Sequence, residues 1–172
     1  MATLFEWGSA QEDGRRAPSV SVASGVVTNN IDTLVQGKIL VRIPALDQEV
    51  WARIAAPCAG PGSGFFFLPV VGAEVLLVLA GDDPTDAFVI GSLWNDRDAL
   101  PVDDPVTALT TRILRSGVVS GVGHQIEMDD LAQSLTITTS TDQKITMDPA
   151  KIELTNLAGS VTISSCAALT IL

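Results

Sequence analysis

The side chains that could carry out chemistry are few, and they lie far apart in the sequence. His124 is the only histidine, and a histidine that acts as a general base must reach the proton it removes. No serine or cysteine with a catalytic signature lies near it, so we interpret His124 as the start of a β-strand. Asp129 and Asp130 offer carboxylate oxygens to a cation, but Ca²⁺ takes about six to eight oxygen ligands. A further ligand at suitable spacing is hard to find, so this pair is interpreted as a turn.

The other candidates for a ligand site are interpreted as turns and loops. Asp82 and Asp83 precede Pro84, which is a turn-forming arrangement. Residues 60–64, Gly-Pro-Gly-Ser-Gly, have the glycines of a phosphate-binding loop, but no lysine follows them and they open no helix. We therefore expect no catalytic residue, no metal site and no cofactor.

Phe65, Phe66 and Phe67 could form a stacking platform for single-stranded nucleic acid, as exposed aromatic side chains do in some OB folds. The chain has a formal net charge of −10 and a pI of about 4.3, whereas phosphate binding requires a basic surface. We therefore expect no nucleic-acid partner. The three phenylalanines are expected in a core or in a contact between subunits.

The composition is apolar without indicating a membrane span. Charged residues make up 17% of the 172 residues, against about 25% in soluble domains, and the mean hydropathy is +0.36. The most apolar stretch, residues 70–80, is shorter than the roughly 20 residues of a spanning helix. Residues 1–14 do not resemble a signal peptide, so we expect synthesis in the cytoplasm, with Cys58 and Cys166 reduced. Such a chain is expected to hide apolar surface against other chains.

The elements that must position these side chains are short β-strands. Between residues 24 and 95, short runs of apolar and alternating residues are separated by turn residues, which is typical of strands. Five such runs without a convincing helix predict a small OB-type barrel over residues 19–95. The nearly continuous apolar run at residues 74–79 is expected to be buried on both faces. The five predicted strands are residues 25–30, 38–43, 50–54, 74–79 and 87–94.

Residues 109–172 contain a different pattern, joined to the barrel by an acidic, proline-containing linker at residues 96–108. Apolar-polar-apolar triplets recur about every seven to ten residues between turn residues, which is typical of a repetitive β array. Each triplet has too little apolar surface to fold alone. A single chain could coil into a solenoid, but we favour a β-helix that is intertwined in a homotrimer with one shared core. The predicted core residues are Ile126, Met128, Leu135, Ile137, Ile145, Met147, Ile152, Leu154, Val161 and Ile163.

A set of short motifs occurs in a characteristic order within the predicted barrel. They are Gly25-Val26-Val27, Asp32, residues 37–44, Trp51-Ala52-Arg53, Gly60, Gly64, and residues 69–75, 81–84 and 90–95. Together they resemble the OB-fold domain of phage baseplate protein V, T4-type tail spikes and the VgrG proteins of type VI secretion. Residues 123–130 resemble the entry into the trimeric β-helix of that family.

The departures from the family's pattern point to a short spike. Only an arm of residues 1–18 precedes the barrel, whereas many VgrG proteins begin with a hub domain, so we expect a separate hub protein. The linker is too short for the lysozyme domain of T4-type spikes, and His124 is no His-x-His apex. The turn at residues 81–84 has two aspartates where the family usually has one.

The resemblance implies a structural, non-enzymatic role as the central spike of a contractile tail or injection system, assembled into the baseplate of a virion or injection particle. The spike would join the hub protein and tail tube to the tip, and would pierce the target envelope when the sheath contracts, in transient contact with the membrane. Phe5 and Trp7 are expected to face the hub, although they could also pack on their own domain. Leu169, Ile171 and Leu172 are expected to bind a tip protein of the PAAR type.

Three other classes were weighed against the spike. An OB-fold binding module predicts a basic groove, which the charge disfavours. A cell-wall hydrolase predicts a carboxylate pair or a Cys/His set in a helical domain, which the sequence does not offer. A passive fibre protein predicts the same β-helix outside the tail axis, and only its location in the particle would distinguish it.

Overall fold

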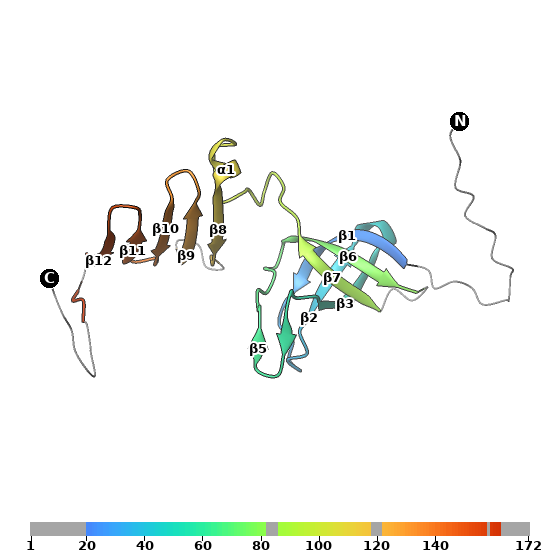
Figure 1. The fold of residues 1–172 in the computed structure, drawn as a ribbon. Coiled ribbons are helices and arrows are strands. Elements are labelled where there is room, and N and C mark those ends of the chain that lie inside the picture. The colour runs from blue at the N-terminus through green and yellow to red at the C-terminus, as the bar shows by residue number, and fades with distance from the viewer. Residues whose placement is uncertain (1–19, 82–85, 118–121, 158, 163–172) are drawn as a thin grey trace, which may run out of the picture. The chain divides into compact units, whose positions relative to one another are not determined.

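The computed structural model describes residues 20–81, 86–117, 122–157 and 159–162, and the chain divides into two compact units, residues 1–98 and 99–172. Nearly all regular elements are β-strands (Figure 1), so the predicted all-β class is confirmed. The predicted arm, residues 1–18, lies outside the described residues, as do Asp82 and Asp83. No helix in the described ranges is long and apolar enough to cross a membrane.

The first unit is a closed barrel of five strands. The strands β1 (Val20–Asn29), β2 (Lys38–Ile43), β3 (Gln48–Ile54), β7 (Ala87–Ser92) and β6 (Glu74–Ala80) pair in that order, and β6 closes onto β1. All neighbouring strands are antiparallel except β3 and β7. A 3₁₀ helix, Pro44–Leu46, joins β2 to β3. The OB-type barrel is therefore confirmed, with β1 starting earlier than predicted and β7 ending at Ser92.

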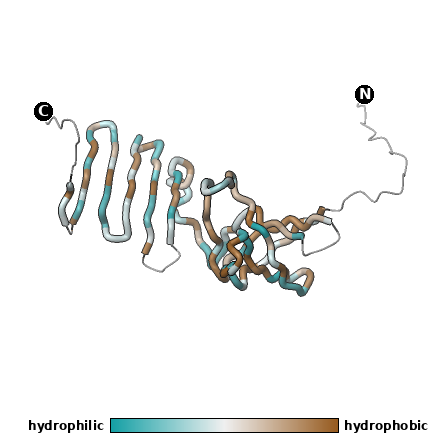
Figure 2. The backbone as a smooth tube through the Cα atoms, turned by 90° about the horizontal axis from the view of Figure 1, so that it is seen from below, coloured by the Kyte–Doolittle hydropathy of each residue, from teal (hydrophilic) through white to brown (hydrophobic). Residues whose placement is uncertain are grey.

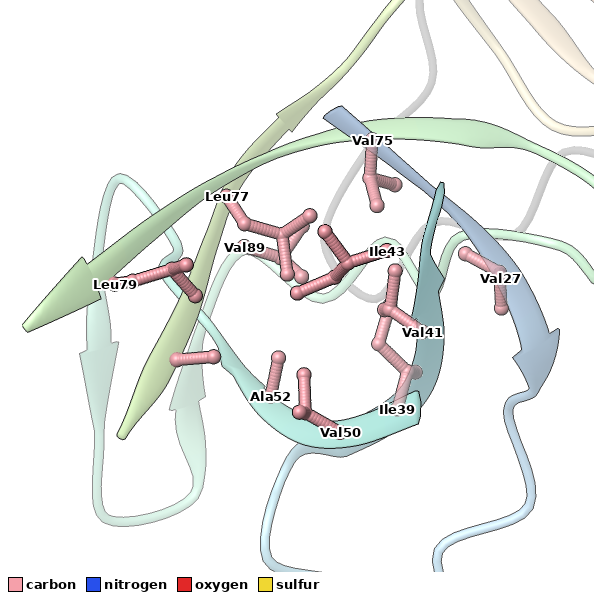
Figure 3. Close-up of a cluster of buried hydrophobic side chains, with 11 residues drawn as sticks. Val27, Ile39, Val41, Ile43, Val50, Ala52, Val75, Leu77, Leu79 and Val89 are labelled. Atoms are coloured by element: carbon pink, nitrogen blue, oxygen red, sulfur yellow. The ribbon is translucent and has the colours of Figure 1, made fainter. Parts of the chain in front are cut away.

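Side chains that alternate along the strands fill the interior of the barrel. Ile39, Val41 and Ile43 of β2 are completely buried, and the residues between them face outward. Figure 3 shows how inward side chains from different strands meet around one centre. Burying one such side chain contributes about 1.5–3 kcal/mol. This cluster is therefore the main hydrophobic core of the described residues.

Strand β6 follows the same alternation, so the prediction that it is buried on both faces is wrong. Val75 and Leu77 have no exposed surface and Leu79 is 5% exposed, whereas Leu76 and Val78 are only partly buried. The physical reason is that a closed barrel encloses only one face of each strand. The apolar outer face of β6 lies on the surface of the barrel.

The glycine-rich segment, interpreted as a loop, contains a small hairpin. Its strands are β4 (Ala59–Gly60) and β5 (Ser63–Gly64). Gly62 and Gly64 have φ angles of 69° and 139°, which residues with a Cβ atom rarely adopt. A Cβ atom on Gly64 would also collide with the carbonyl oxygen of Cys58. These glycines therefore serve a tight turn.

Asp32 organises the connection between β1 and β2. Its carboxylate accepts hydrogen bonds from the N–H groups of Leu34, Gln36 and Lys38 at 3.1, 2.6 and 3.1 Å. The N–H of Lys38, followed by those of Gln36 and Leu34, lowers the pKa of Asp32 because each favours the charged carboxylate. These hydrogen bonds explain why the motifs of the barrel include an aspartate at position 32.

The second unit contains one antiparallel sheet that winds back and forth (Figure 1). The sheet consists of β8 (Thr111–Arg115), β9 (Gln125–Asp129), β10 (Ser134–Thr138), β11 (Lys144–Met147) and β12 (Ile152–Thr155), and the strands neighbour one another in chain order. A single helical turn, α1 (Thr107–Thr110), precedes β8. The Asp104 carboxylate accepts the N–H of Thr107 at 2.7 Å, and this bond lowers the pKa of Asp104.

Gly25 in β1 is predicted to tolerate no side chain. A Cβ atom there would lie 2.5 Å from Val41 Cγ1 and 2.9 Å from both the Arg42 carbonyl oxygen and Leu77 Cδ1. We expect Gly25→Ala to lower the free energy of unfolding by about 1–3 kcal/mol, as overpacked cores do, in a urea titration. Gly91→Ala in β7 is the matched control, because nothing lies within 4 Å of its added Cβ. Equal losses in both variants would contradict this packing.

Candidate functional site

The register of the C-terminal sheet collects the apolar side chains of β9 to β12, together with Leu114 of β8, on one face. Side chains two residues apart in a strand share a face of the sheet. Pairing between neighbouring strands aligns these side chains into two rows that run across the sheet. The hydropathy colours along these strands alternate accordingly (Figure 2). One row is Leu114, Ile126, Ile137, Ile145 and Leu154, and the other is Met128, Leu135, Met147 and Ile152.

This apolar face is not covered in the single chain. Ile152, Leu154 and Met128 are 72%, 54% and 44% exposed, and the buried apolar core of the described residues contains barrel residues only. An antiparallel sheet normally packs its apolar face against a core. Contiguous apolar patches of this kind mark contact surfaces. The face is therefore the strongest candidate for a functional site in the second unit.

The opposite face of the same sheet is polar across β9 to β12, and Ile113 of β8 is aligned with this face. Glu127, Thr136, Thr146 and Glu153 form the row that crosses β9 to β12. Lys151 forms an ion pair with Glu153, and this hydrogen-bonded contact lowers the pKa of Glu153 and raises that of Lys151. Both side chains are about half exposed, so the pair contributes little to stability. The polar side chains of this face suit contact with water.

The turns between the strands use aspartate side chains. The Asp129 carboxylate accepts the N–H groups of Leu131 and Ala132, and Asp148 accepts those of Ala150 and Lys151. The interpretation of Asp129 as a turn residue is therefore confirmed. Within the described ranges, no group of three or more His, Cys, Asp and Glu residues is arranged to hold a metal ion.

His124 lies directly before β9, where the sequence placed the start of a strand. Its N–H donates to Ser116 Oγ at 2.9 Å, and its carbonyl oxygen accepts the N–H of Ser116 at the same distance. These contacts join the ends of β8 and β9. The backbone of His124 thus has a structural role in the sheet.

The three phenylalanines of the barrel unit are exposed. Phe65, Phe66 and Phe67 follow β5 and are 57%, 78% and 54% exposed. These exposed fractions exclude the three phenylalanines from the core of the barrel. Of the two predicted roles, a contact between subunits stays a prediction.

Eight of the ten residues predicted to form the core of the β-helix, from Ile126 to Leu154, lie on the apolar face of the C-terminal sheet. Val161 is described but belongs to no strand, and it is 52% exposed. Leu114 was missed, because β8 reads Thr-Arg-Ile-Leu-Arg and lacks the apolar-polar-apolar triplet. The predicted hub, core and tip residues outside the described ranges are Phe5, Trp7, Ile163, Leu169, Ile171 and Leu172.

Comparison with known families identifies the barrel. The family model described as the type VI secretion system/phage-baseplate injector OB domain matches residues 23–94. The match begins within β1 and extends just beyond β7, so it includes all five barrel strands. No curated protein matches the chain. The barrel of this chain is therefore similar to the OB domain of type VI secretion system and phage-baseplate injectors.

Proposed function

We propose that this chain is the central spike of a contractile tail or injection system, and that it works as a homotrimer with a shared C-terminal core. The observation that carries the proposal is the uncovered, two-row apolar face of the C-terminal sheet, on a chain whose barrel matches the injector OB domain. That match supports a role among baseplate or injector components. The trimer and the piercing step are the parts that we add.

The apolar face supports assembly from several copies. A lone sheet with one apolar face has no second layer to exclude water, and stable domains bury such faces between at least two layers. Identical chains have identical apolar rows, so each copy can cover the others. The C-terminal sheet would then become part of a β-helix whose polar face, with Glu127 and Thr136, remains outside.

The width of the sheet favours three copies around one axis. A five-residue strand such as β9 or β10 is about 17 Å long. The centre of an equilateral triangle with sides of that length lies about 5 Å from each side, which is half of the roughly 10 Å between packed sheets. Three inward-facing sheets would therefore fill their axis with side chains, whereas four would leave a hollow.

A filled core of this kind suits a piercing role. Close-packed interiors have low compressibility, so a needle with an apolar axis resists bending when pushed. The sheath supplies the work, and the proposal assigns no catalytic step, metal or cofactor to this chain. Its partners would be the hub protein and tail tube at the barrel, a PAAR-type tip protein at the needle, and transiently the target membrane.

The two faces of β10 predict opposite effects of the same charge. Ile137 lies in an apolar row and Thr136 lies next to it on the polar face. Ile137→Asp would place a carboxylate in the shared core at a cost of several kcal/mol, so we expect loss of the trimer peak in size-exclusion chromatography. Thr136→Asp should keep that peak. If both variants eluted at the same volume as the unaltered protein, the shared core would be contradicted.

Tip binding is predicted to depend on residues 169–172. Leu169, Ile171 and Leu172 supply apolar side chains, and exposed apolar patches are typical of binding surfaces. Deleting residues 169–172 should abolish pull-down of a PAAR-type tip protein, while the number of chains in the oligomer stays unchanged. Retained tip binding would overturn this assignment and leave the trimer proposal intact.

A further inference from the structure

A groove lies beside the β4–β5 hairpin of the barrel unit. Its volume is about 950 Å³, within the range of pockets that enclose ligand-sized groups. The lining comes from the end of β3 and the residues after it, from β7, and from the hairpin with Phe65, Phe66 and Phe67. The exposed phenylalanines are therefore part of a concave surface.

The groove combines apolar walls with a positive charge. Among the described residues that line it, Arg53 is the only one with a charged side chain. The guanidinium carbon of Arg53 lies 4.5 Å from the centroid of the Phe88 ring, a cation–π contact. An aromatic segment that also has acidic side chains would complement this surface.

An apolar strip connects the groove with the start of β1. Val22 pairs with Val78 on β6, Val78 pairs with Phe88 on β7, and Phe88 pairs with Arg53 on β3. Val20 and Val22 are 66% and 62% exposed. Neighbouring strands are about 4.8 Å apart, and β6 lies between β1 and β7. The chain therefore enters β1 about 10 Å from β7, which lines the groove.

The N-terminal segment has the chemistry and the length to occupy the groove. Residues 1–14 contain Phe5 and Trp7, three acidic side chains and no lysine or arginine. Residues 8–19 span up to about 40 Å when extended, which exceeds the separation across the strip. We infer that Phe5 and Trp7 dock in the groove of their own chain, with the acidic side chains of the segment near Arg53.

This docking concerns the barrel unit alone and does not rest on the proposed trimer. It gives the exposed phenylalanines a partner within the chain. It also answers a question that the sequence left open, because Phe5 and Trp7 could face the hub or pack on their own domain. In the free protein they would pack on the barrel, and a hub would have to displace them.

Cys58 provides a reporter for the groove, because it lines the groove and is an exposed free thiol. In full-length protein with Cys166→Ser, Cys58 is the only thiol. We expect Phe5→Ala/Trp7→Ala to raise the rate of its modification by N-ethylmaleimide about tenfold, since a docked segment protects what it covers. Arg53→Glu should also raise the rate, because it repels the acidic side chains. Mass spectrometry measures both rates.

Trp94→Ala is the matched control, because Trp94 is 64% exposed and does not line the groove. It should leave the Cys58 rate unchanged, and the far-ultraviolet circular dichroism of every variant should match that of the parent. Equal rates in the parent, the double variant and Arg53→Glu would overturn the docking. Protection that disappears on dilution would overturn the assignment to the same chain. Acceleration by Trp94→Ala would show general loosening instead of docking.

Discussion

The exposed apolar face of the C-terminal sheet is the constraint that connects the fold of this protein to its role. Side chains in a strand alternate with a period of two, so one strict register places all the isoleucines, leucines and methionines of β9 to β12 on the same side. A slip by one residue would reverse both faces. The Asp129 and Asp148 carboxylates accept backbone N–H groups in the turns and so stabilise the ends of the strands. The sheet is thus specified locally, whereas the cover for its apolar face is not supplied by the described chain.

The barrel shows the opposite solution to the same physical problem. Closing β6 onto β1 removes the free sheet edges and places one face of every strand inside. Its core can form from one chain, with Val75, Leu77 and Val89 completely or almost completely buried. The barrel therefore has a self-contained core. The sheet suits an element that is completed by other copies.

The predictable parts of the structure are those in which burial on one side sets the pattern. The alternating run at β2 and the triplets of β9 to β12 could be predicted because apolar and polar side chains alternate along these strands. The outer face of β6 was misread, since Leu76 and Val78 are as apolar as their buried neighbours. Strand β8 was missed because Arg112 and Arg115 flank its apolar pair.

Local backbone chemistry explains the other differences between sequence and structure. The β4–β5 hairpin depends on glycines at positive φ, which a glycine-rich sequence permits without requiring. The single turn of α1 depends on hydrogen bonds that the N–H and hydroxyl of Thr107 donate to the Asp104 carboxylate, in a segment predicted to be a linker. In the proposed trimer, the cover of the apolar face and the register between chains depend on contacts with other copies, so neither can be read from one sequence.

The most direct test of the shared core is the solution mass of the full-length protein by light scattering, before and after a long hold in SDS without boiling. The account predicts a mass of three chains of 18.0 kDa each, and persistence of that trimer in the detergent. A monomer of 18.0 kDa before detergent would contradict it, because the apolar face of the C-terminal sheet would then be stable in water without a partner.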